Sequence, residues 1–250
     1  LAVAMARQEC TLRPGDIVVL NDPYLGGTHL PDITMVSQCA GPPGFFVASR
    51  AHHADVGGMS PGSMPLATEV YQEGLIIPPI KLVERGRVNQ AALALICRNV
   101  RTPQERRGDL AAQIAAQRLG ERRLAEAAAR HGAATLQEHA DALLAYSERL
   151  MRAAIRSAPN GVYAFEDYLD DDGQGGDPLR IAVTVTIEDE QATVDFTGSA
   201  AESVGGLNAV FAVTCSAVYY VFTCLAGEDT PPNHGCYAPI RIIAPPGTIV

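Results

Sequence analysis

Two segments of this sequence concentrate its histidine, aspartate and glycine: Asn21-Asp22-Pro23-Tyr24-Leu25-Gly26-Gly27-Thr28-His29-Leu30-Pro31-Asp32 and Ser49-Arg50-Ala51-His52-His53-Ala54-Asp55-Val56-Gly57-Gly58. They contain three of the six histidines of the 250-residue chain. Glycine and proline are frequent in both segments, which predicts loops. The residues between them read as strands, and loops held by strands are where ligands and catalytic groups tend to lie.

The spacing of the histidines and aspartates predicts a metal site. His29 and Asp32 lie three residues apart, and His52 and His53 close the strand expected at 44–50. Two strand ends joined by a short loop can bring such groups together. Two imidazoles and one carboxylate suit a divalent metal that keeps positions open for substrate or water. A single His-x-x-Asp pair arises often by chance, so the prediction depends on both segments together.

The adjacent histidines are expected to divide their roles. Neighbouring side chains on extended backbone point to opposite faces, so one of His52 and His53 ligates and the other lies beside the site. Asp22 and Asp55 are candidates for orienting a ligand histidine or for proton transfer.

Charge, cysteine content and the lack of long apolar segments exclude several classes of partner and location. The formal net charge is −9 and no basic run alternates with aromatic residues, which argues against a nucleic-acid partner. The six cysteines form no Cys-x-x-Cys pair, which predicts free thiols in a reducing cytoplasm. No signal peptide or membrane-spanning helix is evident, so we expect a cytoplasmic protein without a membrane partner. The chain lacks an initiator methionine and stops within an apparent strand, so we expect truncation at both ends.

The order of elements predicts an α+β fold in three regions. Residues 1–100 are β-rich and carry the metal motifs, residues 101–158 form a helical hairpin, and residues 159–250 are β-rich with a buried helix. The expected strands are 17–20, 33–39, 45–49, 162–169, 179–187, 191–196 and 240–243, and the expected helices are 89–98, 109–130, 135–157 and 209–225.

Three local signals refine this order. Thr102 and Glu105 resemble a capping box, with proline at the first helical position between them. Residues 40–44 are expected to form the turn of the first hairpin, although Gly41-Pro42-Pro43-Gly44 is not a signature of a tight turn. The acidic run Asp170–Asp177 lacks the spacing of a calcium loop, so it predicts a solvated turn.

Both histidine-bearing segments resemble the signature of the hydantoinase B/oxoprolinase family. The resemblance covers essentially the whole chain and continues through Pro61-Gly62-Ser63-Met64-Pro65, Glu69-Val70-Tyr71-Gln72-Glu73-Gly74-Leu75, Pro78-Pro79-Ile80-Lys81-Leu82, Asp195-Phe196-Thr197-Gly198-Ser199 and Gly206-Leu207-Asn208. It implies a divalent metal (Zn, Mn or Fe) held by His29, Asp32 and one of the two adjacent histidines. We favour His53 as that ligand, with His52 beside it. Asp22, His52 and Asp55 are then the catalytic or orienting groups.

The resemblance implies the metal-bearing subunit of an ATP-dependent hydrolase that opens small cyclic amides such as hydantoins or 5-oxoproline. The chain has no recognisable ATP site, so ATP would be used by a hydantoinase A-type partner subunit in a hetero-oligomer. One alternative is the alpha subunit of an acetone carboxylase-type, ATP-dependent ketone carboxylase. A second is a structural subunit with a vestigial metal site, which the intact His29, Asp32 and histidine pair argue against.

Overall fold

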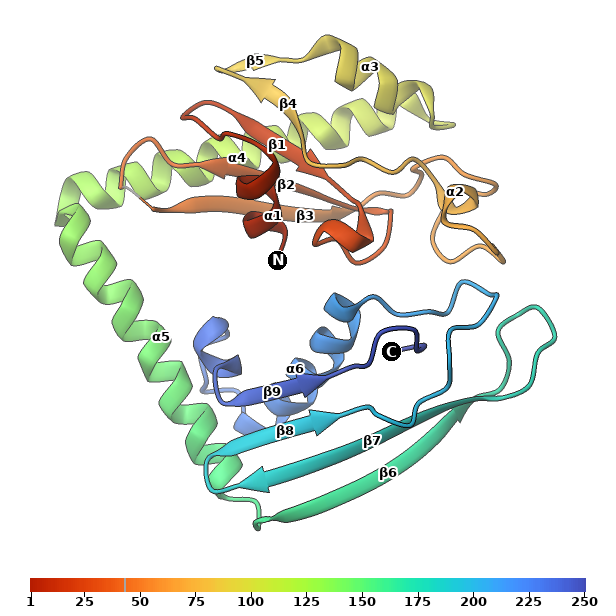
Figure 1. Cartoon of the computed structure of the whole chain (residues 1–250). Helices are drawn as coiled ribbons and strands as arrows, with labels where there is room; N and C mark the ends of the chain where they lie inside the picture. Colours follow the sequence, from red (N-terminus) through yellow and green to blue (C-terminus); the bar gives the residue numbers. More distant parts are fainter. Residues whose placement is uncertain (43) are drawn as a thin grey trace. The chain divides into compact units, whose positions relative to one another are not determined.

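The chain forms two compact units, which a computed structural model describes for residues 1–42 and 44–250 (Figure 1). The first unit is Leu1–Leu136 and the second is Gln137–Val250. Each unit combines a sheet with helices, which confirms the predicted α+β class. The boundary between the units lies inside a helix, so it differs from the boundaries of the three regions expected from the sequence.

Five antiparallel strands form the sheet of the first unit, in the order β3-β2-β1-β4-β5. The strands are β1 (Ile17–Leu20), β2 (Asp32–Gln38), β3 (Phe46–His52), β4 (Ile80–Glu84) and β5 (Arg87–Val88). Arg85 and Gly86 join β4 to β5 with φ of 49° and 79°, and positive φ at both positions is the type I′ geometry that matches the twist of a hairpin. Pro43, in the turn predicted between β2 and β3, lies outside the described residues.

Successive side chains along a strand point to opposite faces of the sheet, so the core of the first unit has two layers. One layer packs against α1 (Ala2–Glu9) and consists of Val18, Leu20 and Val36. The other packs against α3 (Gln90–Arg98) and α4 (Pro103–His131), and its strand residues include Ile17, Val19, Ile33 and Met35. Figure 1 shows the long α4 running along the sheet. All four residues of β1 are buried because both faces of this central strand are covered.

Buried glutamines fix α4 against β2 and β3. Nε2 of Gln117 donates to the Met35 carbonyl at 2.8 Å and to the Ser49 hydroxyl at 2.9 Å. Its Oε1 accepts from the Ser37 hydroxyl at 3.0 Å. Gln113 lies one turn earlier on the same buried face. The helix is therefore held to the sheet by directional hydrogen bonds as well as by apolar packing.

Local sequence explains most of the helix ends. The side chain of Asn89 accepts from two backbone amides at the start of α3. Pro103 is the first residue of α4, but the side chain of Thr102 makes no capping hydrogen bond, so the expected capping box does not form. Gly132, with φ of 88°, ends α4, and α5 (Ala133–Arg156) follows at once. Because α4 lies in the first unit and nearly all of α5 in the second, the expected helical hairpin stays a prediction.

The second unit has a four-stranded sheet in the order β6-β7-β8-β9, in which only β8 and β9 pair in parallel. The strands are β6 (Gly161–Leu169), β7 (Leu179–Glu188), β8 (Gln191–Asp195) and β9 (Ile240–Ile243). The core joins the sheet to α5 and to α6 (Phe211–Ala226), whose contributing residues are Met151, Ile155, Val218 and Phe222. The helix expected to be buried is buried on this face only, because Tyr220 and Val221 are exposed. In the described part of the chain, no helix has the length and apolar character that crossing a bilayer requires.

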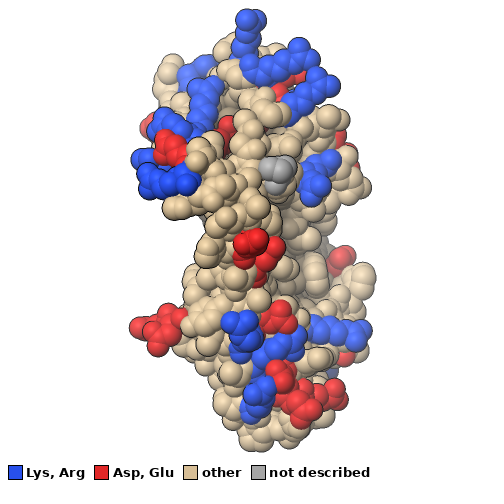
Figure 2. Space-filling view, turned by 90° about the vertical axis from the view of Figure 1, so that its left-hand side faces the viewer, with Lys and Arg blue, Asp and Glu red and all other residues tan. Residues whose placement is uncertain are grey.

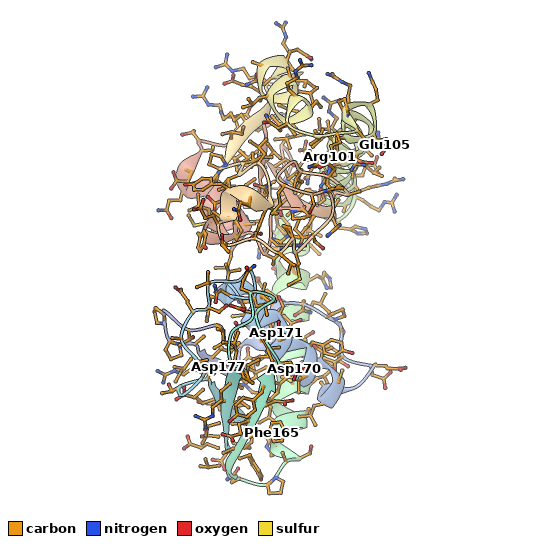
Figure 3. The ribbon with its side chains drawn as sticks, turned by 90° about the vertical axis from the view of Figure 1, so that its right-hand side faces the viewer. Arg101, Glu105, Phe165, Asp170, Asp171 and Asp177 are labelled. Carbon is orange, nitrogen blue, oxygen red and sulfur yellow. The ribbon has the colours of Figure 1, made fainter. Side chains whose placement is uncertain are left out.

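The net negative charge is carried by the second unit. That unit has 5 Lys and Arg against 16 Asp and Glu, whereas the first has 14 against 12. Both signs of charge are nevertheless visible on the face shown in Figure 2. The acidic loop between β6 and β7 is exposed at Asp170, Asp171 and Asp177 (Figure 3), which confirms the predicted solvated turn. A concentrated basic surface of the kind that binds nucleic acid is not expected from this balance.

Replacing Gln117 by leucine should destabilise the first unit. The substitution keeps the side-chain volume but leaves the Ser37 hydroxyl without its buried acceptor and the Met35 carbonyl without this donor. Loss of such buried bonds costs roughly 1–3 kcal/mol. The measurement is the urea midpoint of Gln117→Leu beside Arg107→Ala, an exposed position on the same helix that should change stability by less than about 0.5 kcal/mol. Equal midpoints for the two variants would contradict the role given to Gln117.

Candidate metal site

The register between β2 and β3 brings two of the predicted site residues together. Asp32 pairs directly with His52, so their side chains project from the same face of the sheet. His29 lies in the loop just before β2, and its ring centroid is 5.1 Å from that of His52. Nε2 of His29 is 3.4 Å from Oδ2 of Asp32. His29, Asp32 and His52 therefore meet at one end of the β2–β3 hairpin, on the face where α1 packs further along.

The loop before β2 needs its particular residues to place His29. The Asp22 side chain accepts from the amide of Tyr24 at 2.9 Å and so caps the short helix η1 (Pro23–Leu25). Gly27 follows, and a Cβ there would lie 2.6 Å from the Asn21 carbonyl oxygen, so only glycine fits without backbone movement. Asp22 thus shapes the loop. Within the described residues no contact joins its side chain to a histidine, and its expected catalytic role stays a prediction.

Asn21 was not singled out from the sequence, yet it is fully buried and holds the loop. Its Nδ2 donates to the carbonyls of Leu30 at 2.8 Å and Leu75 at 2.9 Å. Its Oδ1 accepts from the amide of Ile77 at 2.6 Å. Close by in sequence, the Thr28 hydroxyl donates to Oδ2 of Asp32 at 2.5 Å, which orients the carboxylate beside His29. The sequence did offer a signal for the role of Asn21, because this polar residue lies between an apolar strand and a glycine-rich loop.

His53 lies on the opposite face of the sheet, as strand alternation predicts, and is only 2% exposed. Nε2 of Gln113 donates to the Ile33 carbonyl at 3.0 Å, so its Oε1 must be the atom 2.9 Å from Nε2 of His53. This contact requires a proton on Nε2 of His53. Burial lowers the pKa of the ring, which keeps it neutral, although the Gln113 hydrogen bond acts in the opposite direction.

The preference for His53 as the ligand is therefore not supported by the geometry, which places His52 beside His29 and Asp32. The sequence could not decide between the two histidines because the choice depends on the register with β2. The buried side around His53 has no room for a substrate. The cavity lined by His53, Asp55 and Arg106 measures about 10 Å³, which at most holds one water molecule.

Asp55 is buried and binds a second segment of the chain instead of a histidine. Its carboxylate accepts from the amides of Gly57 at 2.9 Å and Arg101 at 2.5 Å, and forms an ion pair of 2.9 Å with the Arg101 guanidinium. Burial alone would raise the pKa of Asp55, but these hydrogen bonds and the Arg101 charge together lower it. Arg101, labelled in Figure 3, also donates to the Gly58 carbonyl. Asp55 therefore fixes the loop after β3, and its expected catalytic role has no contact to support it.

The donor set at the hairpin end fits a divalent metal in chemical type, with two imidazoles and one carboxylate. The side chains of His29 and Asp32 are 33% and 20% exposed, so the donors are reachable from solvent. As the side chains are placed, no group of three His, Cys, Asp or Glu within residues 1–42 and 44–250 has the spacing of a metal cluster. Binding would therefore require rotation of at least one of these side chains.

Comparison with known proteins gives matches along the whole chain. Residues 1–250 match the family model described as Hydantoinase B/oxoprolinase. A putative D-/L-hydantoinase subunit of Pseudomonas sp. (strain NS671) is 35% identical over 258 residues, which cover 96% of this chain and 43% of that protein. The 5-oxoprolinase 1 of Arabidopsis thaliana is 34% identical over 268 residues, covering 96% and 21% of the two chains.

A solved structure agrees with these sequence matches. The crystal structure of the ATP-dependent caprolactamase from Pseudomonas jessenii superposes with a TM-score of 0.89 at 30% identity, covering all of this chain and 45% of that one. The chain thus spans less than half the length of each of these relatives.

Replacing Asp55 by asparagine should lower stability at neutral pH by roughly 1–3 kcal/mol, because an amide group cannot accept all three hydrogen bonds. The lowered pKa also gives a pH dependence. The carboxylate stabilises the fold above its unfolded-state pKa of about 3.9, and this contribution is lost as pH falls through the lower folded-state pKa. Urea midpoints between about pH 2 and 5 should therefore fall less steeply in Asp55→Asn than in the parent protein. Glu69→Gln, a substitution at an exposed position, is the control and should keep the parent slope.

Proposed function

Because the chain belongs to the hydantoinase B/oxoprolinase family, we propose that it forms the metal-bearing part of an ATP-dependent enzyme that opens small cyclic amides. The observation that carries the proposal is the meeting of His29, Asp32 and His52 on a solvent-facing sheet surface. The names of the relatives support the substrate class, because hydantoin, 5-oxoproline and caprolactam, from which these names derive, are all cyclic amides.

We assign the metal to His29, Asp32 and His52, in place of the sequence-based choice of His53. When bound, a divalent ion of the Zn, Mn or Fe type would polarise a carbonyl or lower the pKa of a water molecule. The Thr28 hydroxyl orients Asp32, and this leaves the second carboxylate oxygen available as a ligand. On the opposite, buried face, the hydrogen bond from His53 to Gln113 holds the residue next to His52 and so fixes this end of the strand.

Opening an unstrained amide ring is difficult because the resonance of the amide must be lost. ATP supplies a route, since phosphorylation of the amide oxygen would make the ring carbon more reactive. The sequence contains no Gly-rich phosphate loop with lysine, so we propose that a hydantoinase A-type partner subunit binds ATP. The chain would then act within a hetero-oligomer. The ketone carboxylase alternative stays a prediction, and no contact within residues 1–42 and 44–250 favours it.

The metal assignment predicts different behaviour for the two adjacent histidines. His29→Ala, Asp32→Asn and His52→Ala should each lower metal affinity by more than the roughly 100-fold that follows loss of an outer partner, whereas His53→Gln should lower it by roughly 10-fold. The measurement is metal content and affinity by elemental analysis and competition with a chelator. His131→Ala, an exposed histidine, is the control. Loss of metal in His53→Gln with retention in His52→Ala would reverse the assignment.

The proposed activity is tested with the complete protein as its source produces it, together with its partner subunit. Hydantoin, 5-oxoproline and caprolactam are supplied with ATP, and both ring opening and ADP release are measured. We expect turnover of at least one cyclic amide and a loss of at least roughly 10³-fold in Asp32→Asn. ATP-dependent carboxylation of acetone, with no cyclic amide consumed, would replace this proposal by the carboxylase alternative.

A further inference from the structure

Arg50 lies beside the candidate metal site and has no role so far. It is on β3, two residues before His52, so both side chains project from the same face. Its partner in the register is Thr34, just as Asp32 is the partner of His52. Positions two apart along a strand are separated by about 7 Å, a distance that an arginine side chain can span.

Two hydrogen bonds hold the Arg50 guanidinium in a defined place. Nε donates to the hydroxyl of Thr34 at 2.9 Å, and Nη2 donates to the carbonyl of Gly26 at 3.0 Å. Gly26 belongs to the loop that carries His29. The cation therefore lies between the sheet face and this loop, next to the groups proposed to hold the metal.

The positive charge of Arg50 is not neutralised within the described part of the chain. Both of its acceptors are uncharged, no carboxylate forms an ion pair with it, and its second terminal nitrogen, Nη1, has no partner there. Arg101 and Arg180 differ from it in this respect, because they form ion pairs with Asp55 and Glu166. A structural link to the loop accounts for Nε and Nη2, and it leaves the exposed Nη1 edge unused on the sheet face that carries His52.

We propose that Arg50 binds an anionic oxygen group of the reacting molecule next to the metal, and this inference rests on the proposed function. Adding water across the C–N bond of a cyclic amide converts the ring carbonyl into a carboxylate and the ring nitrogen into an amine. With ATP, a phosphoryl group is also present during the reaction. Both are oxyanions, and arginine binds carboxylate and phosphate oxygens through its planar array of N–H donors. Arg50 is held by one edge, which leaves Nη1 and the outer edge for such a ligand.

The test measures anion binding directly, in the complete protein with and without added metal. Orthophosphate and acetate are the probes, and their dissociation constants are determined by calorimetry for the parent protein, Arg50→Lys and Arg50→Met. Removing a charged hydrogen-bond donor should weaken binding roughly 10-fold or more in Arg50→Met. The affinity of Arg50→Lys should lie between those of the parent and Arg50→Met, since lysine keeps the charge but lacks the planar pair of N–H donors. Arg107→Met, an exposed arginine on α4, is the matched control and should bind as the parent does.

The outcomes separate this inference from the metal assignment. Weakening for orthophosphate alone identifies a phosphoryl ligand, and weakening for acetate alone identifies a carboxylate; either supports the inference. Equal binding in the parent and Arg50→Met, or no binding of either probe by the parent at millimolar concentration, overturns it. Loss of metal from Arg50→Met also overturns it, because Arg50 would then act only through the His29 loop. If the parent binds no metal but its anion binding still depends on Arg50, the metal assignment fails and this inference stands.

Discussion

The pairing of β2 with β3 is the constraint on which the rest of the first unit depends. Because Asp32 lies opposite His52, a carboxylate and an imidazole share a face without any long-range folding requirement. A shift of one residue would exchange the faces, bringing His53 to the solvent side and His52 into the core. The buried hydrogen bond between His53 and Gln113 disfavours that shift, so the site and the core specify the same register.

The two faces of the sheet in the first unit differ in how completely they are covered. On the α4 side, apolar residues and paired amides pack around His53 and leave a cavity of only about 10 Å³ there. On the α1 side, the helix covers only part of the sheet, and the hairpin end with His29, Asp32, His52 and Arg50 is left accessible. Charged and titratable groups collect where the apolar cover ends, because a charge placed under α4 would be costly to bury.

Much of the fold could be predicted from the sequence, and what the sequence could not decide has physical causes. Apolar runs and alternation located the strands, and motif spacing brought His29 and Asp32 together. The sequence could not decide between His52 and His53, because the side chain that shares a face with Asp32 depends on cross-strand register. The roles given to Asp22 and Asp55 also lacked support, since a carboxylate that caps a turn or pairs with Arg101 resembles a catalytic one in sequence. Gln113 and Gln117 were missed, although their spacing placed them on the face of α4 that also carries Leu110 and Ile114.

The paired glutamines have a consequence for how α4 can move. A helix that packs on a sheet through leucine and isoleucine alone can slide by one turn, about 5.4 Å, and still bury similar surface. The amides of Gln113 and Gln117 each match particular atoms of β2 and β3, so the slid arrangement would leave buried donors unsatisfied. The helix thus has one translational position along the strands. Any displacement of the hairpin end that carries His52 must either carry α4 with it or break these bonds.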